Sequence, residues 1–460
     1  MRTVSHPAAP EWLTIPEDLN RLDPELWPMG AGRDESGCLT IRGHRADDLL
    51  DRFGSPLYIM DEEDFRYRAR EFATHFPGWT VNYAGKAFLC TTVARWVKEE
   101  GLNLDVCSGN ELAVALSAGF PAERIGMHGN NKSIEELELA IEAGVGRIIV
   151  DSFDEISRIE SIASERQCTV PVLVRVTTGV EAHTHEYIAT SHEDQKFGFS
   201  IHSGQALAAL QTCHMSPWIS LKGVHSHIGS QIFDLEGFQV AAYRTMELLA
   251  AFRARASIQL EEVNLGGGFG IAYTTCDSPL SPIELNQGLT RIVEEAIAEY
   301  ALSPVACSIE PGRAICGPAG VALYTVGTIK KVDIGSGLER TYVAVDGGMS
   351  DNIRTALYHA DYSAVLVNRA SHAGPMLSRV VGKHCESGDI LVHDVYLPAD
   401  LRLGDLIAVP GAGAYARSLA SNYNHLTRPA VVAVTSAGAH PILRRENLAD
   451  LLSLDIGFQP

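Results

Sequence analysis

The segment EVNLGGGFG, residues 262–270, joins a short apolar run to a turn made almost entirely of glycine. Seven other runs of the same kind occur along the chain, and longer amphipathic stretches such as 133–143, 154–163 and 289–300 lie between them. The eight runs are Val81–Ala84, Leu102–Val106, Ile125–His128, Ile148–Asp151, Val172–Val176, Leu221–His225, Glu262–Leu265 and Val305–Glu310. Eight strand-like runs that alternate with helical patterns predict a (β/α)8 barrel, the TIM-like architecture of the α/β class.

An open, doubly wound sheet is the alternative to a barrel. Such a sheet commonly binds a dinucleotide through a glycine fingerprint after its first strand, and no such fingerprint follows Val81–Ala84. The glycine run after the seventh strand also departs from that spacing, because position 271 is Ile. The number of strand-like runs and the missing fingerprint both favour the barrel. Ser133, with Glu136 three residues later, predicts the start of one of its helices.

The chain before and after the barrel has a different character. The first fifty-odd residues are polar and rich in Pro, with one strand-like piece near Leu39–Ile41. After about Gly317 the chain is a series of short β-rich runs with few helices between them: Val321–Val326, Tyr342–Val345, Ala364–Val367, Ile390–Val395, Leu406–Val409 and Val431–Val434. We therefore predict an N-terminal extension that joins the β domain (1–55), the barrel (56–317) and a mostly antiparallel C-terminal β domain (318–460).

Composition excludes several classes of protein. Of the 460 residues, 46% are hydrophobic and 20% are charged, which indicates a globular chain with ample length for a large core. Asp and Glu number 57 against 37 Lys and Arg, and this net charge of −20 argues against binding to nucleic acid or to an anionic membrane. No run is long and apolar enough to span a membrane, and no secretory signal is visible. The nine scattered Cys residues indicate reduced thiols, so we expect a cytoplasmic protein.

Polar residues stand where a barrel places its active site, at the carboxyl ends of the strands. Lys86 follows the first strand-like run, Asp105 lies in the second, and His128 ends the third. His227 follows the sixth, and Glu310 ends the eighth. A Lys at a strand end is usually solvated, whereas a partly desolvated Lys at a barrel mouth can form a Schiff base. Lys86 is therefore the candidate nucleophile.

The glycine run 266–270 predicts a phosphate site, because backbone N–H groups can approach a phosphate closely where side chains are absent. Loops after the seventh and eighth strands are the usual phosphate site of a barrel. A phosphate site opposite Lys86 predicts pyridoxal 5'-phosphate, which needs a Lys for its aldehyde and a partner for its pyridine nitrogen. Glu310 is the candidate partner, since a carboxylate keeps that nitrogen protonated. His227 either stacks on the ring or is a hydrogen-bonded core residue.

The C-terminal domain carries a second chemical motif, His384-Cys385-Glu386. We expect no metal there, because adjacent side chains rarely converge on one ion and no second cluster completes the ligands. A thiol that passes a proton, beside a carboxylate that binds a cation, is the better interpretation.

At these residues the sequence closely resembles the diaminopimelate decarboxylases, a family of fold-type III, alanine racemase-like pyridoxal phosphate enzymes of lysine biosynthesis. The resemblance runs from about residue 35 to the C-terminus. The matching segments are Tyr83–Ala87, His128–Ser133, His183–Glu186, Asp194–Gly198, His225–Gln231, Gly266–Gly268, Glu310–Arg313, Asp346–Tyr358 and His384–Asp389.

The resemblance implies a role for each candidate residue. Lys86 would bind the cofactor covalently, His227 would stack on its ring, and Glu310 would pair with the pyridine nitrogen. The rest of the cofactor would be surrounded by Ser230, Gly268, Pro311, Gly312, Arg313 and Tyr415. The substrate would be bound by Arg313, Arg354, Tyr358, Glu386 and Tyr415, and Cys385 would be the proton donor.

The predicted substrate follows from the charges of this set. Arg313 and Arg354 beside Glu386 suit a distal end that bears both a carboxylate and an ammonium, as in meso-2,6-diaminopimelate. The expected reaction yields L-lysine and CO2. The resemblance also implies a homodimer, because in this family the residues matching Cys385 and Glu386 reach the active site of the partner subunit.

Three alternatives stay open. The nearest is another fold-type III decarboxylase that acts on ornithine, arginine or carboxynorspermidine. Glu386 beside Cys385, together with Arg354, argues against it. The others are a racemase and a non-catalytic carrier of the cofactor. The Cys385 segment suits a decarboxylase better than a racemase, and a carrier would not need the second domain.

Overall fold

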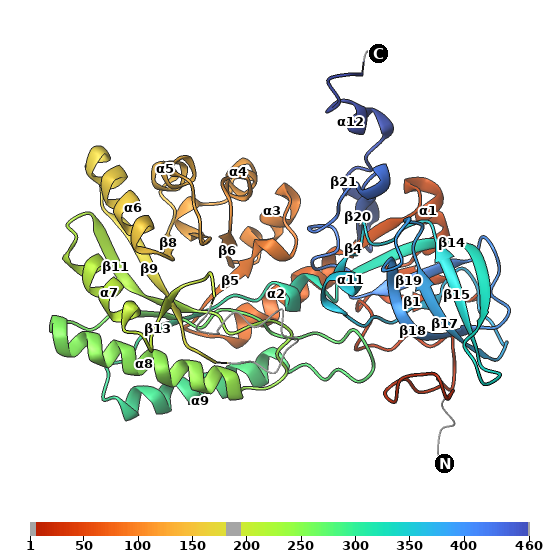
Figure 1. Ribbon diagram of the computed structural model, residues 1–460, viewed down its shortest axis with the longest axis horizontal. Coiled ribbons are helices and arrows are strands. Elements are labelled where there is room, and N and C mark those ends of the chain that lie inside the picture. Colours follow the sequence, from red (N-terminus) through yellow and green to blue (C-terminus); the bar gives the residue numbers. More distant parts are fainter. Residues whose placement is uncertain (1–5, 181–194, 459–460) are drawn as a thin grey trace. The chain divides into compact units, whose positions relative to one another are not determined.

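The computed structural model describes residues 6–180 and 195–458. The chain divides into two compact units, and Figure 1 gives the labels of their helices and strands. The barrel unit comprises residues 68–270 and 279–315, and the β unit comprises the residues up to 67, 271–278 and those from 316 onward. Of the segments that carry the family resemblance, His183–Glu186 and Asp194 lie outside the described residues. In the described part of the chain, no helix is long and apolar enough to cross a membrane.

Eight parallel strands close into a ring in the barrel unit. They are β5 (Thr80–Ala84), β6 (Asn103–Val106), β7 (Ile125–Met127), β8 (Arg147–Val150), β9 (Val170–Thr177), β11 (Ile219–Ser226), β12 (Glu262–Asn264) and β13 (Ala306–Ile309). β13 pairs with β5, and β8 pairs with β9, so the ring is closed. The short β10 (Phe199–Ser200) pairs with β9 in addition. The eight predicted strands and the TIM-like barrel are confirmed.

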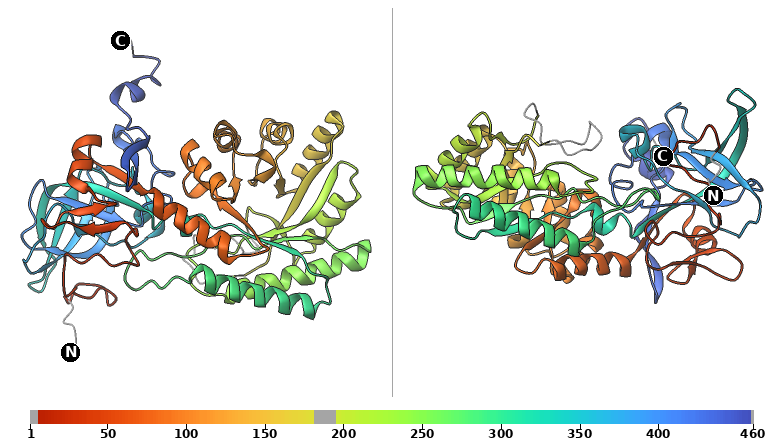
Figure 2. Two further views of the ribbon diagram at one scale, coloured as in Figure 1. Left: turned by 180° about the vertical axis from the view of Figure 1, so that it is seen from behind. Right: turned by 90° about the horizontal axis from the view of Figure 1, so that it is seen from below.

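Helices follow the strands around this barrel. They are α3 (Thr91–Glu99), α4 (Gly109–Ser117), α5 (Ile134–Ala143), α6 (Phe153–Arg166), α7 (Gln205–Met215), α8 (Glu236–Ala256) and α9 (Pro282–Glu299), while α2 (Glu62–His75) and α10 (Arg313–Cys316) run from one unit into the other. Figure 1 shows α3 to α6 along one side of the strands, and α8 and α9 lie side by side along another (Figure 2).

The predicted helix start at Ser133 is confirmed. Ser133 Oγ accepts the N–H of Glu136 at 3.2 Å, and the Glu136 carboxylate accepts the N–H of Ser133 at 2.9 Å. α9 has the same reciprocal cap at Ser281 and Glu284, with Pro282 as its first residue. It therefore starts earlier than the apolar stretch 289–300 indicates, because the cap and not the apolar face sets where a helix begins.

The β unit contains one large sheet with the strand order β18-β17-β15-β14-β4-β20-β21, to which β19 is added on β14 and β16 on β19. The strands are β4 (Leu57–Asp61), β14 (Gly320–Asp333), β15 (Glu339–Val345), β16 (Val365–Leu366), β17 (Pro375–Val381), β18 (Ile390–Pro398), β19 (Leu406–Pro410), β20 (Ala430–Thr435) and β21 (Gly438–Leu443). Among the described residues, β15–β17 and β4–β20 are the parallel pairs of this sheet. The prediction of a mostly antiparallel β domain is confirmed.

β4 is a strand that the sequence analysis does not predict. All five of its residues are buried, and it lies between β14 and β20, which come more than 250 residues later in the chain. By its contacts β4 belongs to the β unit. The domain boundary at residue 55 stays a prediction.

The first part of the chain adds a small sheet and a helix to the same unit. The elements are β1 (Ala31–Arg33), β2 (Leu39–Ile41), β3 (His44–Arg45) and α1 (Ala46–Phe53), while α11 (Arg354–Tyr358) and α12 (Leu448–Leu452) come later. Leu39, Ile41 and Leu49 are buried in one apolar cluster with Val321 and Val432 of the large sheet. Residues from Leu26 to Leu50 of the extension therefore contribute to the folded core of the β unit.

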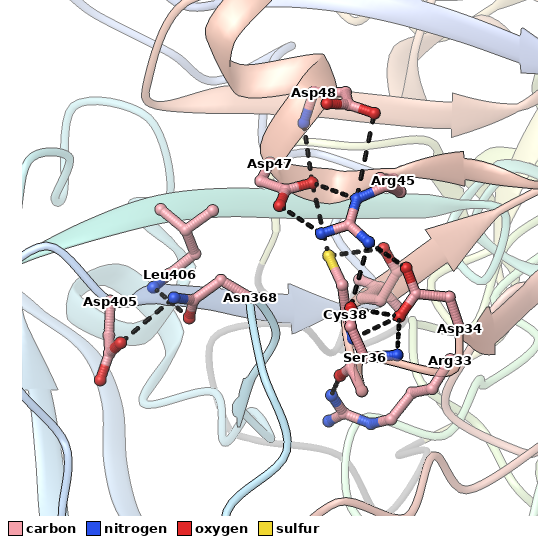
Figure 3. A network of polar contacts seen from close by, with 12 residues as sticks. Arg33, Asp34, Ser36, Cys38, Arg45, Asp47, Asp48, Asn368, Asp405 and Leu406 are labelled. Atoms are coloured by element: carbon pink, nitrogen blue, oxygen red, sulfur yellow. Dashed lines mark hydrogen bonds and ion pairs between the residues drawn. The ribbon is translucent and has the colours of Figure 1, made fainter.

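Charged contacts fix the turn between β1 and β2 (Figure 3). Arg45 pairs with Asp34 and with Asp47, whose Oδ2 lies 2.6 Å from Arg45 Nη2. The Cys38 thiol lies 3.5 Å from Asp47 Oδ1. Asp34 in turn accepts the N–H of Cys38 at 3.0 Å. This network ties the turn between β1 and β2 to β3 and to the first turn of α1.

Candidate active site

The carboxyl ends of the barrel strands surround a cavity of about 260 Å³. Lys86 lines it from a single turn of 3-10 helix, Gly85–Ala87, directly after β5. His227 follows β11 and Glu310 follows β13, and both line the same cavity. The structure therefore brings together the three residues that the sequence analysis assigns to the aldehyde, the ring face and the pyridine nitrogen.

Glu310 is the anionic group of this cavity. Its Oε1 accepts a hydrogen bond from Asn264 Nδ2 at 2.8 Å, and it lies 3.1 Å from His225 Nε2 and 3.4 Å from His128 Nε2. Burial acts to raise the pKa of Glu310, but the two imidazoles outweigh it and hold the pKa below its usual value. A protonated pyridine nitrogen would find a carboxylate here.

The pKa values of the groups around Glu310 are shifted as well. Burial and the charge of Glu310 raise the pKa of Asp105 well above its ordinary value. Burial lowers the pKa of His128 to about 4 and also lowers the pKa of His225. Burial therefore favours the uncharged form of each of these three side chains.

Some polar atoms around the cavity lack partners, which tests whether the predicted cofactor fits. Among the described residues, Asp105 Oδ2, His128 Nε2, His225 Nε2 and Ser226 Oγ are buried with no hydrogen-bond partner. Buried polar atoms are rarely left unsatisfied in native proteins. A polar group in this cavity is therefore expected, and pyridoxal phosphate supplies one.

His227 is suited to lie against an aromatic ring. Burial, and after it the positive charge of Lys86, lower the pKa of His227 well below its usual value, so the imidazole is neutral. The N–H of Gly267 donates to His227 Nδ1 at 3.4 Å. This contact fixes one ring nitrogen as the acceptor.

The glycine run after β12 has no room for side chains. Gly266 and Gly268 have φ angles of +71° and +104°. A Cβ at Gly267 would lie 2.1 Å from the carbonyl oxygen of Glu310, and one at Gly268 would lie 2.3 Å from that of Gly229. Packing of this turn against the backbone of Glu310 and Gly229 therefore requires glycine, and it leaves backbone N–H groups uncovered by side chains of the turn.

The turn after β13 completes this part of the site. Arg313 Nη2 donates to Ser230 Oγ at 2.7 Å. The carbonyl of Pro311 accepts the N–H of Ala84 at 3.3 Å, and a Cβ at Gly312 would lie 2.9 Å from Ala84 Cβ. The predicted phosphate-binding residues of the barrel unit thus come from neighbouring strand ends, and the turn packs against the strand that leads to Lys86.

Arg175 and Phe197 also line the cavity, and the sequence analysis misses both. The Arg175 guanidinium lies 4.4 Å from the centre of the Phe197 ring. Burial lowers the pKa of Arg175. The signal that could have found it is a single charge inside the apolar run VPVLVRVT of β9. A buried Arg in a barrel strand rarely occurs without a partner.

Arg354 and Tyr358 stand at the two ends of α11 in the β unit. Arg354 is 2% exposed, its guanidinium lies 4.4 Å from the centre of the Tyr273 ring, and Nη1 donates to the hydroxyl of Tyr362. Within the described residues its Nε has no hydrogen-bond partner. Tyr415 has a φ of +64°, a conformation that residues other than glycine seldom adopt.

Cys385 and Glu386 are exposed on the turn between β17 and β18. Hydrogen bonds of the buried residue His384 hold this turn in place. Asp389 accepts the N–H of His384 at 2.7 Å, and His384 Nε2 lies 2.8 Å from Ser350 Oγ. The thiol and the carboxylate are therefore presented outward from a rigid base. That these side chains meet a cofactor cavity stays a prediction.

Comparisons with known proteins agree with this geometry. The model of the family "Pyridoxal-dependent decarboxylase, pyridoxal binding domain" matches residues 62–317. The chain is 53% identical to a diaminopimelate decarboxylase of Mycobacterium leprae (strain TN) over 456 residues, which is 98% of this chain and 97% of the relative. It is 46% identical to the Bacillus subtilis (strain 168) protein of that name, with 93% and 97% covered.

Solved structures give the same result. The diaminopimelate decarboxylase of M. jannaschii in complex with L-lysine superposes with a TM-score of 0.86 at 30% identity and covers 94% of this chain and 98% of its own. The Helicobacter pylori protein of the same name, also complexed with L-lysine, has a TM-score of 0.81 at 29% identity, with 89% and 98% covered.

Proposed function

The chain belongs to the diaminopimelate decarboxylases, and from that premise we propose how its own residues carry out the reaction. The enzyme is a pyridoxal phosphate-dependent carboxy-lyase that converts meso-2,6-diaminopimelate to L-lysine and CO2, the last step of lysine biosynthesis. The observation that carries the assignment of residues is the cavity in which Lys86, His227 and Glu310 meet.

The barrel unit holds the cofactor. When bound, pyridoxal phosphate supplies an electron sink for the electron pair that remains on carbon after CO2 leaves. Glu310 would pair with the protonated pyridine nitrogen and so keep that sink effective. Ser230, Arg313 and the glycine turn at Gly268 would bind the phosphate group. Lys86 would hold the cofactor through its aldehyde.

Arg313 of the barrel unit and residues of the β unit would supply the substrate contacts, and the β unit would supply the proton. Arg313, Arg354 and Tyr358 bind the carboxylate at the distal end of the substrate, and Glu386 binds the distal ammonium. An Arg fork matches a carboxylate with two parallel hydrogen bonds. Cys385 would give its proton to the carbon that lost CO2, and Tyr415 would lie beside cofactor and substrate. A site of paired charges rejects analogues that lack one of them, because the buried partner would be left alone.

Cys385 and Glu386 act in the partner subunit of a homodimer under this proposal. Their exposure on a rigid turn supports it, since a residue that completes a second chain's site must stand free of its own chain. A cytoplasmic location is proposed with it. The nine cysteines, all free, support a reducing compartment.

A substrate panel tests the function. The purified enzyme with pyridoxal phosphate is incubated with meso-diaminopimelate, ornithine, arginine and D-ornithine, and CO2 and amine products are measured. Lysine from diaminopimelate alone is expected. CO2 from ornithine or arginine instead would keep the cofactor and overturn the roles of Arg354 and Glu386.

A variant at Lys86 tests the cofactor linkage. Lys86→Ala is expected to abolish turnover and the absorbance of the Lys-bound cofactor. Substantial residual activity would exclude Lys86 from that role.

A further inference from the structure

The floor of the cofactor cavity contains donors arranged as metal ligands. His128, His225 and Glu310 each offer one donor atom, and these atoms all lie within 4.8 Å of one another. Asp105 adds a fourth donor, because its Oδ1 lies 3.4 Å from His128 Nε2. Nothing in the decarboxylation reaction uses this set as a metal site.

The donor separations match those of a coordinated ion. Nitrogen and oxygen ligands lie about 2.0–2.2 Å from zinc, and at tetrahedral angles such ligands are about 3.3–3.6 Å apart. His225 Nε2 is 3.1 Å and His128 Nε2 is 3.4 Å from Glu310 Oε1. Together with the contact between Asp105 and His128, three pairs of donor atoms therefore already lie near the distances found around a bound ion.

The imidazole nitrogens of His128 and His225 are free to bind a metal ion. Within the described residues, the Nε2 atoms of His128 and His225 have no hydrogen-bond partner, and the two residues are 7% and 1% exposed. Asn264 donates to Glu310 at 2.8 Å, which is the outer-shell contact that ligating carboxylates usually have.

We propose that the cofactor-free chain binds one divalent transition metal ion of the zinc class through His128, His225 and Glu310, with Asp105 as the fourth ligand. Two imidazoles favour zinc or cobalt over magnesium or calcium, which prefer oxygen. Metal and cofactor exclude one another, because both need the Glu310 carboxylate. This competition rests on the proposed function. Metal binding then delays loading of the newly made or stripped chain with pyridoxal phosphate.

A metal titration of the full-length chain, stripped of pyridoxal phosphate with hydroxylamine and dialysed, tests the site. Co²⁺ is the spectroscopic probe, and Zn²⁺ is followed by calorimetry. One ion per chain is expected, with visible bands of a nitrogen- and oxygen-ligated Co²⁺ and without the intense band of a thiolate ligand. Such a thiolate band would assign the ion to cysteine and overturn the proposal.

Two ligand variants and one control locate the ion. His128→Gln and His225→Gln are expected to weaken binding at least about tenfold, since even outer-shell changes weaken metal affinity 10- to 100-fold. His440→Gln, at an exposed histidine of β21, is expected to bind as the unchanged chain does. Circular dichroism confirms that each variant is folded. Equal binding by all of these chains would overturn the site.

The holoenzyme supplies a measurement that needs no variant. Enzyme loaded with pyridoxal phosphate is expected to take up no Zn²⁺ at this site, and Zn²⁺ added to the stripped chain is expected to slow the return of cofactor absorbance at least tenfold. Metal uptake that is the same with and without cofactor would refute the competition. Decarboxylation by chelator-treated holoenzyme is assayed separately, so a failed metal titration leaves the proposed function standing, and a failed decarboxylase assay leaves the metal titration interpretable.

Discussion

Asn424 is a single residue on which the geometry of the predicted proton donor depends. Its Oδ1 accepts the N–H of Cys385 at 3.2 Å and lies 3.1 Å from His384 Nδ1. Asn424 and the next residue, His425, have φ angles of +50° and +56°, and left-handed backbone at such residues is unfavourable unless the surroundings enforce it. The amide oxygen is thus placed under the turn that carries the thiol.

Replacement of Asn424 separates this hydrogen bond from the backbone conformation. Asn424→Gly keeps the positive φ but removes the acceptor, and we expect kcat to fall about tenfold, consistent with the loss of one or more hydrogen bonds near 1.5 kcal/mol in total. Asn424→Asp keeps an acceptor and should retain most of the activity. Affinity for pyridoxal phosphate, measured by absorbance titration, is expected to be unchanged in both. A loss of cofactor in Asn424→Gly would contradict a role confined to Cys385.

Asp351 makes the stability of the β unit depend on pH. Burial raises the pKa of Asp351 to about 7, although its carboxylate accepts hydrogen bonds from the hydroxyl of Tyr324 and the N–H of Gly348. The charges of Asp389 and Asp346 act in the same direction as burial. In the unfolded chain the pKa is about 3.9. Between these two values the folded chain holds a proton that the unfolded chain lacks.

The free energy of unfolding should therefore decrease as pH rises from about 4 to about 7, by about 1.4 kcal/mol per pH unit from this residue. Above the folded-state pKa this contribution to the slope vanishes. Asp351→Asn removes it, and urea midpoints at pH 5, 6, 7 and 8 compare the two chains. The changes of the midpoint with pH are compared, and not the midpoints themselves. The amide in Asp351→Asn cannot accept from both Tyr324 and Gly348, so the midpoints differ for a reason unrelated to the proton. Equal slopes would exclude Asp351 as the source.

At the scale of elements, one buried ion pair joins three pieces of the barrel wall. Lys132 and Glu155 are each 1% exposed, with 2.6 Å between Nζ and Oε1. Lys132 Nζ also donates to the carbonyls of Gly129 after β7 and Ile149 in β8, at 2.8 Å and 2.7 Å. Gly129 lines the cofactor cavity. The pair therefore links the wall of that cavity to α6.

Removal of one partner leaves the other charge buried. Lys132→Met is expected to lower the free energy of unfolding by about 3–5 kcal/mol. Lys132→Met combined with Glu155→Gln should recover a large part of that loss, because the amide has no charge and its oxygen still accepts the N–H of Asp151, as Glu155 does at 2.9 Å. Denaturant unfolding measures both. No recovery in the double variant would mean that packing of the Lys132 stem, and not charge, is responsible.

Elements with a local signal are predictable from this sequence, and elements without one are not. The apolar barrel strands and the Ser133 cap of α5 carry their signal within a few residues. In the sequence, β4 is a short apolar run between Pro56 and a helix. Its position between β14 and β20 depends on strands that come much later in the chain. β17 mixes Arg379 and Ser378 with apolar residues and so lacks a continuous run.

Site residues show the same contrast. Lys86, His227 and Glu310 are predictable because a parallel barrel brings the carboxyl ends of its strands together at one rim. Arg175 is missed because it is read as part of an apolar strand. The contacts of His384 with Ser350 and Asn424 depend on three separate segments folding against each other, which no spacing rule encodes.

At the scale of the whole molecule, the proposed homodimer divides each active site between two chains. Lys86 belongs to the barrel unit and Cys385 to the β unit. If Cys385 acts in the partner's site, Lys86→Ala and Cys385→Ala each disable both sites of their own homodimer. A mixed dimer then has one site with both substitutions and one site with neither.

Mixing the two inactive variants tests this arrangement directly. With random exchange of subunits, half of the dimers are mixed and half of their sites are intact, so activity should return to about a quarter of the unchanged enzyme in a symmetric dimer. The two proteins are denatured and refolded together, and lysine formation is measured against each variant refolded alone. A control mixture of Lys86→Ala with Glu310→Ala, both in the barrel unit, should regain nothing, because no mixed site is then free of a substitution. Equal failure of both mixtures, with mixed dimers shown by differential tags, would place Cys385 in the site of its own chain.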